Sequence, residues 1–214
     1  MDQRLMMFLL PLVVVGVGRL GAVAAHRVLP MQPAMAATLA VYYGLIAASV
    51  LWVRRTVPGA QSAPSFYSGR RPRGWRVVVG VVLPALPLAV FFLRNLGPVA
   101  PAVAAGVLFF AAFSATCEET FWRGLMFHLP GPDWIRIVYP AAVFSFMHWF
   151  NVVPYVRLIP RHVVIMVVST FALGVVWMWF QLRERSLVFP IASHAAIDAF
   201  ALLAMAMQQQ AHGA

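Results

Sequence analysis

The sequence contains no lysine, a single cysteine and only six acidic residues among its 214 positions. Charged residues make up 10% of the chain, whereas hydrophobic residues make up 62%. A soluble domain carries roughly 25% charged and roughly 45–50% apolar residues, so a soluble core of this size would leave much apolar surface in water. The composition therefore excludes an ordinary soluble domain and indicates an integral membrane protein whose partner is the lipid bilayer.

The few charges are unequally divided between the two signs. Sixteen basic residues, all of them arginine, stand against six acidic ones, and the net charge is +10. In a membrane protein, arginines in the loops set the topology and contact anionic headgroups, so we expect no nucleic acid partner. The absence of lysine is typical of a GC-rich bacterial genome. The lone Cys117 excludes an intrachain disulfide and a metal site built from cysteine alone.

Seven apolar stretches approach or exceed the length of about 20 residues that a helix needs to cross a bilayer. The sequence therefore predicts an all-α, polytopic transmembrane helix bundle of about seven spans, which forms a single membrane domain over residues 1–214. The predicted spans are Leu5–Ala25, Pro33–Val53, Trp75–Leu93, Val99–Phe127, Trp134–Val153, His162–Leu182 and Leu187–Met207.

The longest hydrophilic stretch, about residues 54–76, is a basic loop between the second and third spans. It holds six arginines among prolines, glycines and serines. Because positively charged loops stay in the cytoplasm, this loop predicts a cytoplasmic N-terminus and, after seven spans, a C-terminus outside. The predicted location is the inner membrane of a bacterium.

Three of the six acidic residues, Glu118, Glu119 and Asp198, fall inside apolar stretches. A charged side chain at the bilayer centre costs about 2.5–3.5 kcal/mol on insertion scales, so such residues face the bundle interior and mark function. Glu119 and Arg123 are helical i, i+4 neighbours in the favourable order, which predicts an ion pair between them. Glu118 has Trp122 at i+4 and therefore needs either a partner from another helix or a raised pKa.

Two histidines lie inside later spans. His148 follows Phe144 by four residues and His194 precedes Asp198 by four, so each pair shares one helix face. A lone buried histidine is more often a packed core residue than a catalyst, and a His–Asp pair can simply tie one helical turn together. The helical rise of about 1.5 Å per residue, however, places both histidines, Asp198 and Glu118 at similar depths, roughly 10–21 Å below one membrane face.

The three motifs occur in the order Glu-Glu-x-x-x-Arg, Phe-x-x-x-His and His-x-x-x-Asp, each on its own predicted span, within a core of about residues 99–207. This pattern resembles the CPBP family, which includes the type II CAAX prenyl endopeptidases and bacterial relatives linked to bacteriocin immunity and protein sorting. The resemblance implies a glutamic-type intramembrane endopeptidase with its active site inside the bilayer. Its substrate would be cleaved near the C-terminus of a membrane-anchored or lipidated protein.

In that family the first glutamate and the histidine of the second motif activate a water, and the third motif stabilises the oxyanion. The resemblance therefore implies that Glu118 is the general base and that His148 positions or polarises the water. His194, with Asp198, would stabilise the oxyanion. Amide hydrolysis needs both a positioned base and donors aimed at the oxyanion. The implied supporting residues are Glu119, Arg123, Phe144 and Cys117.

One departure from the family pattern is Asp198, because the prenyl endopeptidases have asparagine there. An ionised carboxylate cannot donate a hydrogen bond to an oxyanion, so Asp198 must be protonated, orient His194 or bind a metal. The alternative mechanism is a zinc-dependent one that uses His148, His194 and Glu118 as ligands and leaves a position for water. The resemblance favours the mechanism without a metal or other cofactor.

Cys117 directly precedes Glu118. It is either a small apolar residue of the helix or a thiol in or near the site. Within the family, the myxosortase-like sorting proteins act on proteins with C-terminal membrane anchors. The substrate implied here is of the same kind, namely a C-terminal helix flanked by basic residues.

Two other classes of function stay open. A proton-coupled membrane transporter would use Glu118, Asp198 and the histidines as a proton relay, but it predicts inverted repeats, and we detect none in the sequence. A haem protein ligated by His148 and His194 would leave the two adjacent glutamates without a role.

Overall fold

The computed structural model contains helices and no strand over the residues that it describes, which confirms the predicted all-α class. Those residues are 3–57, 74–78, 82–94, 96–152 and 160–213. Five helical segments are long and apolar enough to cross a membrane, which confirms a polytopic helical membrane protein. They are Arg4–Val28, Met31–Thr56, Pro101–His128, Val163–Glu184 and Val188–Gln208.

Two of the predicted spans have a different status. The stretch Trp75–Leu93 contains the short helix α3 (Gly74–Val77) and the longer helix α4 (Leu83–Arg94), with residues between them outside the described part. The stretch Trp134–Val153 coincides with helix α6 (Asp133–Val152), which is not among the five segments with the length and hydropathy of a span. The count of seven spans therefore stays a prediction.

The chain divides into two compact units. Unit 1 comprises Met1–Ala63 and Thr120–Leu182, and unit 2 comprises Pro64–Glu119 and Arg183–Ala214. The boundary after Glu119 cuts through the first motif. The single membrane domain stays a prediction. So does the topology, because most of the basic loop at residues 54–76 lies outside the described residues.

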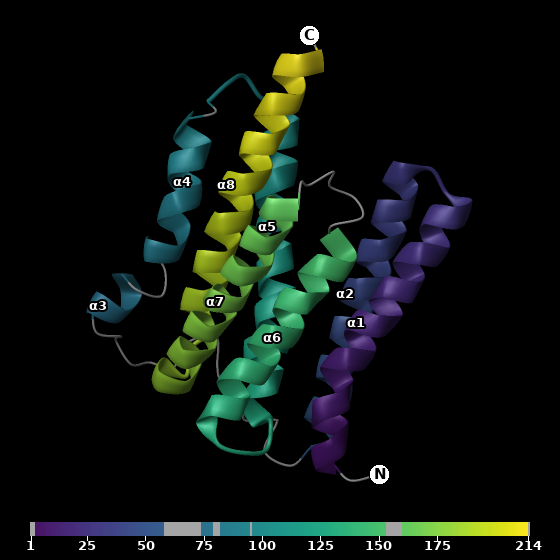
Figure 1. The fold of residues 1–214 in the computed structure, drawn as a ribbon, viewed down its shortest axis with the longest axis vertical. Coiled ribbons are helices and arrows are strands. Elements are labelled where there is room, and N and C mark those ends of the chain that lie inside the picture. The colour runs from purple at the N-terminus through teal and green to yellow at the C-terminus, as the bar shows by residue number, and fades with distance from the viewer. Residues whose placement is uncertain (1–2, 58–73, 79–81, 95, 153–159, 214) are drawn as a thin grey trace. The chain divides into compact units, whose positions relative to one another are not determined.

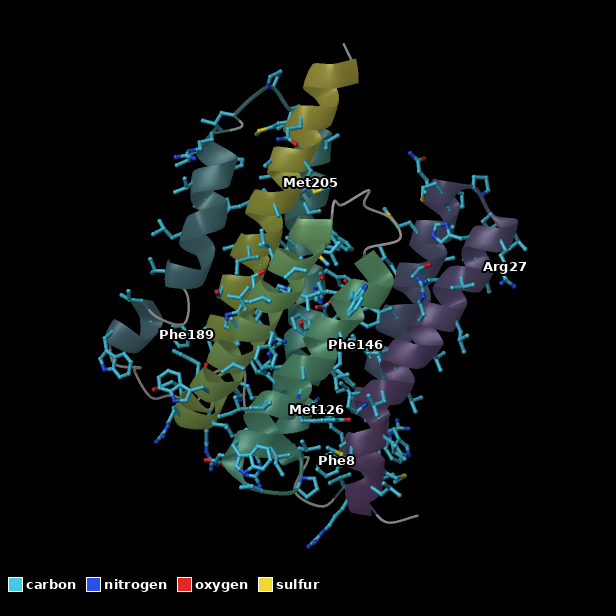
Figure 2. The ribbon with its side chains drawn as sticks, in the orientation of Figure 1. Phe8, Arg27, Met126, Phe146, Phe189 and Met205 are labelled. Atoms are coloured by element: carbon cyan, nitrogen blue, oxygen red, sulfur yellow. The ribbon has the colours of Figure 1, made fainter. Side chains whose placement is uncertain are left out.

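In unit 1, α1 (Gln3–Val28) and α2 (Met31–Thr56) form a helical hairpin (Figure 1). Arg27, labelled in Figure 2, lies in the last turn of α1. The carbonyl of Pro30 accepts the first helical hydrogen bond of α2, at 2.9 Å from the Ala34 nitrogen. Buried residues recur every three or four positions along α2, so one face packs while the other is left to lipid. They are Ala34, Thr38, Tyr42, Ile46, Ser49 and Val53.

The helix that carries the first motif changes its winding. It is α-helical as α5 (Pro101–Glu119), π-helical as η3 (Thr120–Leu125) and 3₁₀-helical as η4 (Met126–His128). Within unit 1, the Trp122 indole N–H donates to the Tyr42 hydroxyl at 3.3 Å and ties η3 to α2. A π-helical turn is rare, and such turns are frequent at functional sites.

Helix α7 (Pro160–Glu184) packs closely against α6 within unit 1. The Ser145 hydroxyl donates to the Val167 carbonyl at 2.5 Å. Gly174 permits the close approach, because a Cβ atom added there would lie 2.9 Å from the Cβ of Ala141. Small residues at such crossings are what allow membrane helices to pack tightly.

In unit 2, α8 (Val188–Gly213) packs along α5 and α4 (Figure 1). The rings of Phe92 on α4 and Phe200 on α8 have centroids 5.6 Å apart. Arg185, with a φ of 53°, lies in the connection that precedes α8. The packing of α8 against α5 matters most here, because each of these two helices carries part of the predicted site.

Candidate active site

Four of the predicted site residues come together within unit 2. Glu118 and Glu119 end α5, while His194 and Asp198 lie one turn apart on α8. The His194 Nδ1 atom lies 2.7 Å from Glu119 Oε1. Its Nε2 atom lies 3.9 Å from Glu118 Oε2 and 3.6 Å from Asp198 Oδ2. One imidazole therefore faces three carboxyl groups.

These three contacts differ in kind. Only the one to Glu119 has the length of a hydrogen bond, because separations of 3.6 Å and 3.9 Å exceed the hydrogen-bond range. His194 and Asp198 therefore make no direct hydrogen bond that would tie one helical turn together. Glu118 does face a group from another helix, as the lack of a polar partner at i+4 predicted.

The four residues of this cluster differ in how far they are buried. Glu119 is 0% exposed, His194 5% and Glu118 7%. The Asp198 side chain is 27% exposed and is the most accessible of the four. A buried charged group is tolerated only when it is paired and hydrogen-bonded, and the contact between His194 Nδ1 and Glu119 Oε1 supplies a partner for one atom of each side chain.

The contact to Glu119 also determines which atoms of His194 carry hydrogen. An ionised carboxylate only accepts hydrogen bonds, so Nδ1 must donate to Glu119. Nε2 then holds a lone pair in the neutral ring and an N–H in the positively charged ring. With Glu119 ionised, His194 donates from Nε2 only as an imidazolium.

His148 lies in unit 1, on α6, and is half-buried. Its Nδ1 atom lies 2.9 Å from the carbonyl oxygen of Phe144, one turn earlier. Because a carbonyl only accepts, Nδ1–H is the donor, and Nε2 of the neutral ring carries the lone pair. The Phe144 ring also meets the imidazole edge to face, with centroids 4.6 Å apart. Phe144 therefore orients His148 through both its backbone and its ring.

Arg123 lies in unit 1 between two aromatic rings and is 1% exposed. Its guanidinium carbon is 4.5 Å from the ring centroid of Phe144 and 5.0 Å from that of Trp177. Both distances suit cation–π attraction, which strengthens where water is excluded. A Cβ atom at Gly174 would lie 3.4 Å from Arg123 Nη2. The predicted pair of Arg123 with Glu119 joins residues of different units and stays a prediction.

Trp177 and Gly174 were not among the residues singled out from the sequence. They lie three positions apart in an apolar span that holds several other aromatic and small residues, so spacing alone does not distinguish them. Cys117, by contrast, was singled out, and it is a free cysteine of intermediate exposure.

No group of three or more His, Cys, Asp or Glu side chains within the described ranges is arranged to hold a metal ion. The predicted zinc ligands His148, His194 and Glu118 are divided between the two units. The expectation that the protein needs no cofactor therefore stays a prediction, and so does the zinc alternative.

Ionisable side chains buried on helices long enough to cross a membrane define the class as a polytopic membrane protein with a polar intramembrane centre. Residues 100–200 match the family model of the type II CAAX prenyl endopeptidases, Rce1-like. The matched stretch contains all three motifs, and over it the chain belongs to the CPBP family of CAAX-type intramembrane proteases, as the motifs predicted. Such a protease acts on membrane-associated substrates. No individual curated protein and no solved structure matches the chain.

Proposed function

We propose that the protein is a glutamic-type intramembrane endopeptidase that cleaves near the C-terminus of a membrane-anchored or lipidated protein. The observation that carries the proposal is the meeting of Glu118, Glu119 and Asp198 around the His194 imidazole, within the stretch that matches the prenyl endopeptidase family. The proposal also requires that His148 of unit 1 approach this cluster.

Glu118 acts as the general base. It takes a proton from water as the water oxygen attacks the scissile carbonyl, and it returns the proton to the leaving amine nitrogen. Its Oε2 atom lies 3.9 Å from His194 Nε2, which is beyond the length of a hydrogen bond. His148 accepts a hydrogen bond from the same water through Nε2, because its Nδ1–H is committed to the Phe144 carbonyl at 2.9 Å. Proton transfer by a positioned side chain contributes about 10²–10⁴-fold to a rate.

His194 stabilises the oxyanion that forms on the scissile carbonyl. As an imidazolium it donates to Glu119 from Nδ1 and to the oxyanion from Nε2. Its contact with Glu119 fixes the ring, so the donor is in place before the charge develops. Asp198, 3.6 Å from Nε2, lies at the more exposed side of the ring, where the substrate carbonyl would enter.

The decisive experiment replaces Glu118 by Gln in the full-length protein, reconstituted in liposomes with a candidate tail-anchored or prenylated substrate. The cleavage rate is expected to fall by about 10²–10⁴-fold. The matched control is Asp133→Asn, because the Asp133 side chain is 74% exposed at the start of α6. His148→Ala and His194→Ala are expected to lose activity as well. Unchanged cleavage by a folded Glu118→Gln protein rejects the assigned base.

The metal-free mechanism has its own test. We expect purified, active protein to hold far less than one zinc per chain and to keep its cleavage rate after dialysis against a chelator. Stoichiometric zinc, with activity lost on chelation and restored by added zinc, would instead assign the reaction to a metalloprotease with the same ligands.

We infer that the Cys117 thiol takes no covalent part in the reaction, since the proposed chemistry uses water as the nucleophile. Cys117→Ser is expected to keep its cleavage rate within about threefold, a change of well under 1.4 kcal/mol in the barrier. A loss comparable to that of Glu118→Gln would point to a nucleophilic thiol.

We also infer a bacterial inner-membrane location with the N-terminus in the cytoplasm and the C-terminus outside. The support is the excess of arginine in the loop between the second and third predicted spans. Reporters fused to each end and assayed on either side of the membrane test this topology, and a C-terminal reporter active in the cytoplasm contradicts it.

A further inference from the structure

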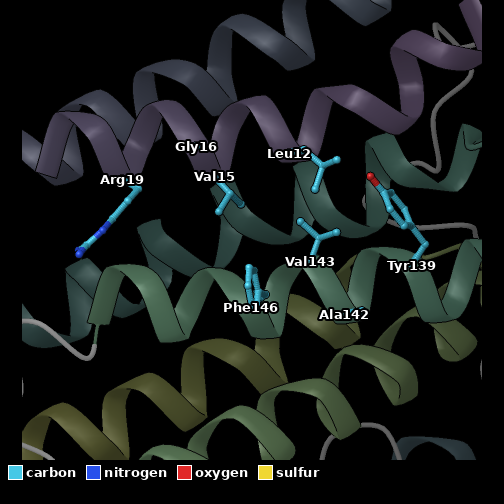
Figure 3. Close-up of a pocket in the computed structure, with 8 residues that line it drawn as sticks. All are labelled: Leu12, Val15, Gly16, Arg19, Tyr139, Ala142, Val143 and Phe146. Atoms are coloured by element: carbon cyan, nitrogen blue, oxygen red, sulfur yellow. The ribbon is translucent and has the colours of Figure 1, made fainter. Parts of the chain in front are cut away.

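A groove with a volume of about 560 Å³ runs between α1 and α6 within unit 1 (Figure 3). This volume falls within the range of about 300–1,000 Å³ that is typical of small-molecule sites. None of the lining residues belongs to the proposed catalytic set. The groove is therefore a feature that the proposed protease chemistry does not use.

The floor of the groove is apolar, and a tyrosine and an arginine lie at its two ends. Leu12 and Val15 of α1 face Val143 and Phe146 of α6 along its length (Figure 3). Leu12 is 49% exposed and Phe146 46%, so the groove opens to the surroundings of the helices. In a membrane those surroundings are lipid, and an apolar groove there takes up an apolar chain.

Tyr139 closes one end. Its hydroxyl donates to the carbonyl of Phe8, and the two rings meet edge to face with centroids 5.4 Å apart. These contacts join α1 to α6 and use the hydroxyl for structure. The Tyr139 end therefore presents mainly a ring to whatever lies in the groove.

Arg19 lies at the other end (Figure 3). It stands nine residues before the end of α1 at Val28, about 14 Å along the helix axis. The stem of a long arginine side chain can lie among apolar atoms while its charged group reaches a polar partner. The guanidinium group binds phosphate with two parallel hydrogen bonds, which an ammonium group cannot do.

We propose that this groove binds a single anionic phospholipid, with one acyl chain along the apolar floor and the phosphate on Arg19. The lining favours an apolar chain, because Arg19 and Tyr139 are the only two of the groove's eight described lining residues with a polar side chain. The cationic group at one end complements an anionic headgroup. The inference is independent of the proteolytic function and concerns a second site on the same chain.

Gly16 provides a direct test because it lies on the groove wall and a Cβ atom there would meet nothing within 4 Å. Gly16→Leu therefore adds an apolar side chain to the groove wall at a position where the Cβ atom has room. Gly44 on α2 is the matched control, since it is also a helical glycine with open space around it and is not part of the groove. Both variants add the same side chain to a helix, so their effects on folding are comparable.

The experiment titrates the full-length protein in detergent with phosphatidylglycerol or phosphatidylcholine and counts bound lipids by native mass spectrometry. The unmodified protein and Gly44→Leu are expected to retain one phosphatidylglycerol preferentially, and Gly16→Leu to weaken this binding at least tenfold. Arg19→Gln is expected to abolish the preference for phosphatidylglycerol while still binding an acyl chain, which keeps the test valid should Gly16→Leu fail to fold.

Two outcomes overturn the proposal. The first is equal binding of phosphatidylglycerol by Gly16→Leu and Gly44→Leu, and the second is an unchanged preference in Arg19→Gln. Blocked cleavage of a membrane-anchored substrate by Gly16→Leu, with lipid binding unaltered, would assign the groove to a peptide. Loss of cleavage in Glu118→Gln alone leaves the lipid site untouched, so the two proposals fail separately.

Discussion

The Nδ1 atom of His194 lies 2.7 Å from Oε1 of Glu119, and this contact joins the second turn of α8 to the last residue of α5. The two side chains are almost wholly buried, and this contact gives each of them a hydrogen-bond partner at one atom. Glu119 is thus a positioning residue for the imidazole that we propose to face the oxyanion. Its contribution is separable from that of Glu118, which faces the other ring nitrogen at 3.9 Å.

Glu119→Ala is expected to destabilise the protein more than Glu119→Gln. Removing one partner of a buried pair costs about 3–5 kcal/mol because the other is left without compensation. Gln keeps an acceptor oxygen for Nδ1–H, so its cost is nearer the roughly 1–3 kcal/mol of an imperfectly satisfied polar group. The free energy of unfolding, measured in detergent with denaturant, distinguishes the two variants.

The control for that series is Asp133→Ala, which removes an exposed ion pair to Arg136 at 3.5 Å. Exposed pairs contribute only about 0–1 kcal/mol. A Glu119→Ala protein that unfolds no more easily than Asp133→Ala would contradict the positioning role.

Asp198→Asn is expected to keep cleavage within about tenfold of the unmodified rate, because the asparagine amide can donate to an oxyanion whatever its surroundings. Asp198→Leu has a similar size and no polar group, and removal of an oxyanion donor costs about 10²–10³-fold in kcat. The measurement is kcat at saturating substrate for both variants. An Asn variant as inactive as the Leu variant would mean that the negative charge of Asp198 itself is needed, to orient His194 or to bind a metal.

Gly174→Ala is expected to destabilise the crossing of α6 and α7, because the new Cβ would lie 2.9 Å from the Cβ and 3.1 Å from the Cα of Ala141. Overpacking of this kind costs typically about 1–3 kcal/mol. The double variant Gly174→Ala with Ala141→Gly removes the nearer contact and keeps the farther one, so it should recover part of the loss. Thermal unfolding of Gly174→Ala, Ala141→Gly and the double variant measures the coupling between the two positions. Strict additivity of the two changes would contradict this packing.

The meeting of Glu118 with a histidine of another helix could be predicted from sequence, because a carboxylate inside an apolar span has few other ways to be stabilised. The same argument found His194 and Asp198, and the three motifs found the family. Which carboxyl group accepts the hydrogen bond of His194 could not be predicted. His194 hydrogen-bonds to Glu119 on α5 and not to Asp198 on its own helix. The sequence did not distinguish these two partners, because the i, i+4 spacing also places Asp198 beside His194.

The winding of the backbone after α5 is a second feature that could not be predicted from the sequence. The sequence predicted continued α-helical spacing after Glu119, but the chain is π-helical from Thr120 to Leu125, where hydrogen bonds span five residues and not four. The pair of Glu119 with Arg123 stays a prediction. No residue type within η3 predicts this change from α-helical to π-helical winding. The aromatic contacts of Arg123 with Phe144 and Trp177 depend on how η3, α6 and α7 pack, which a single sequence does not encode in any local pattern.

A buried amide on α7 leads to the last prediction. Gln181 is 0% exposed, and neither its nitrogen nor its oxygen has a hydrogen-bond partner in the described part of the chain. A buried polar group without a partner costs roughly 1–3 kcal/mol, whereas an apolar side chain of the same length in its place carries no such cost. Gln181→Met is therefore expected to raise the free energy of unfolding by an amount up to that cost.

The matched control is Gln208→Met on α8, where the side chain is exposed and the change should stay within about 0.5 kcal/mol. The comparison also distinguishes a structural fault from a functional one. Stabilisation with full activity means that the amide is only a cost to folding. Stabilisation together with a raised KM means that the amide is kept for a substrate backbone, because an unpaired donor and acceptor in a dry site suit an extended peptide. A Gln181→Met protein that unfolds more easily would contradict both readings, since the amide must then be satisfied in the folded state.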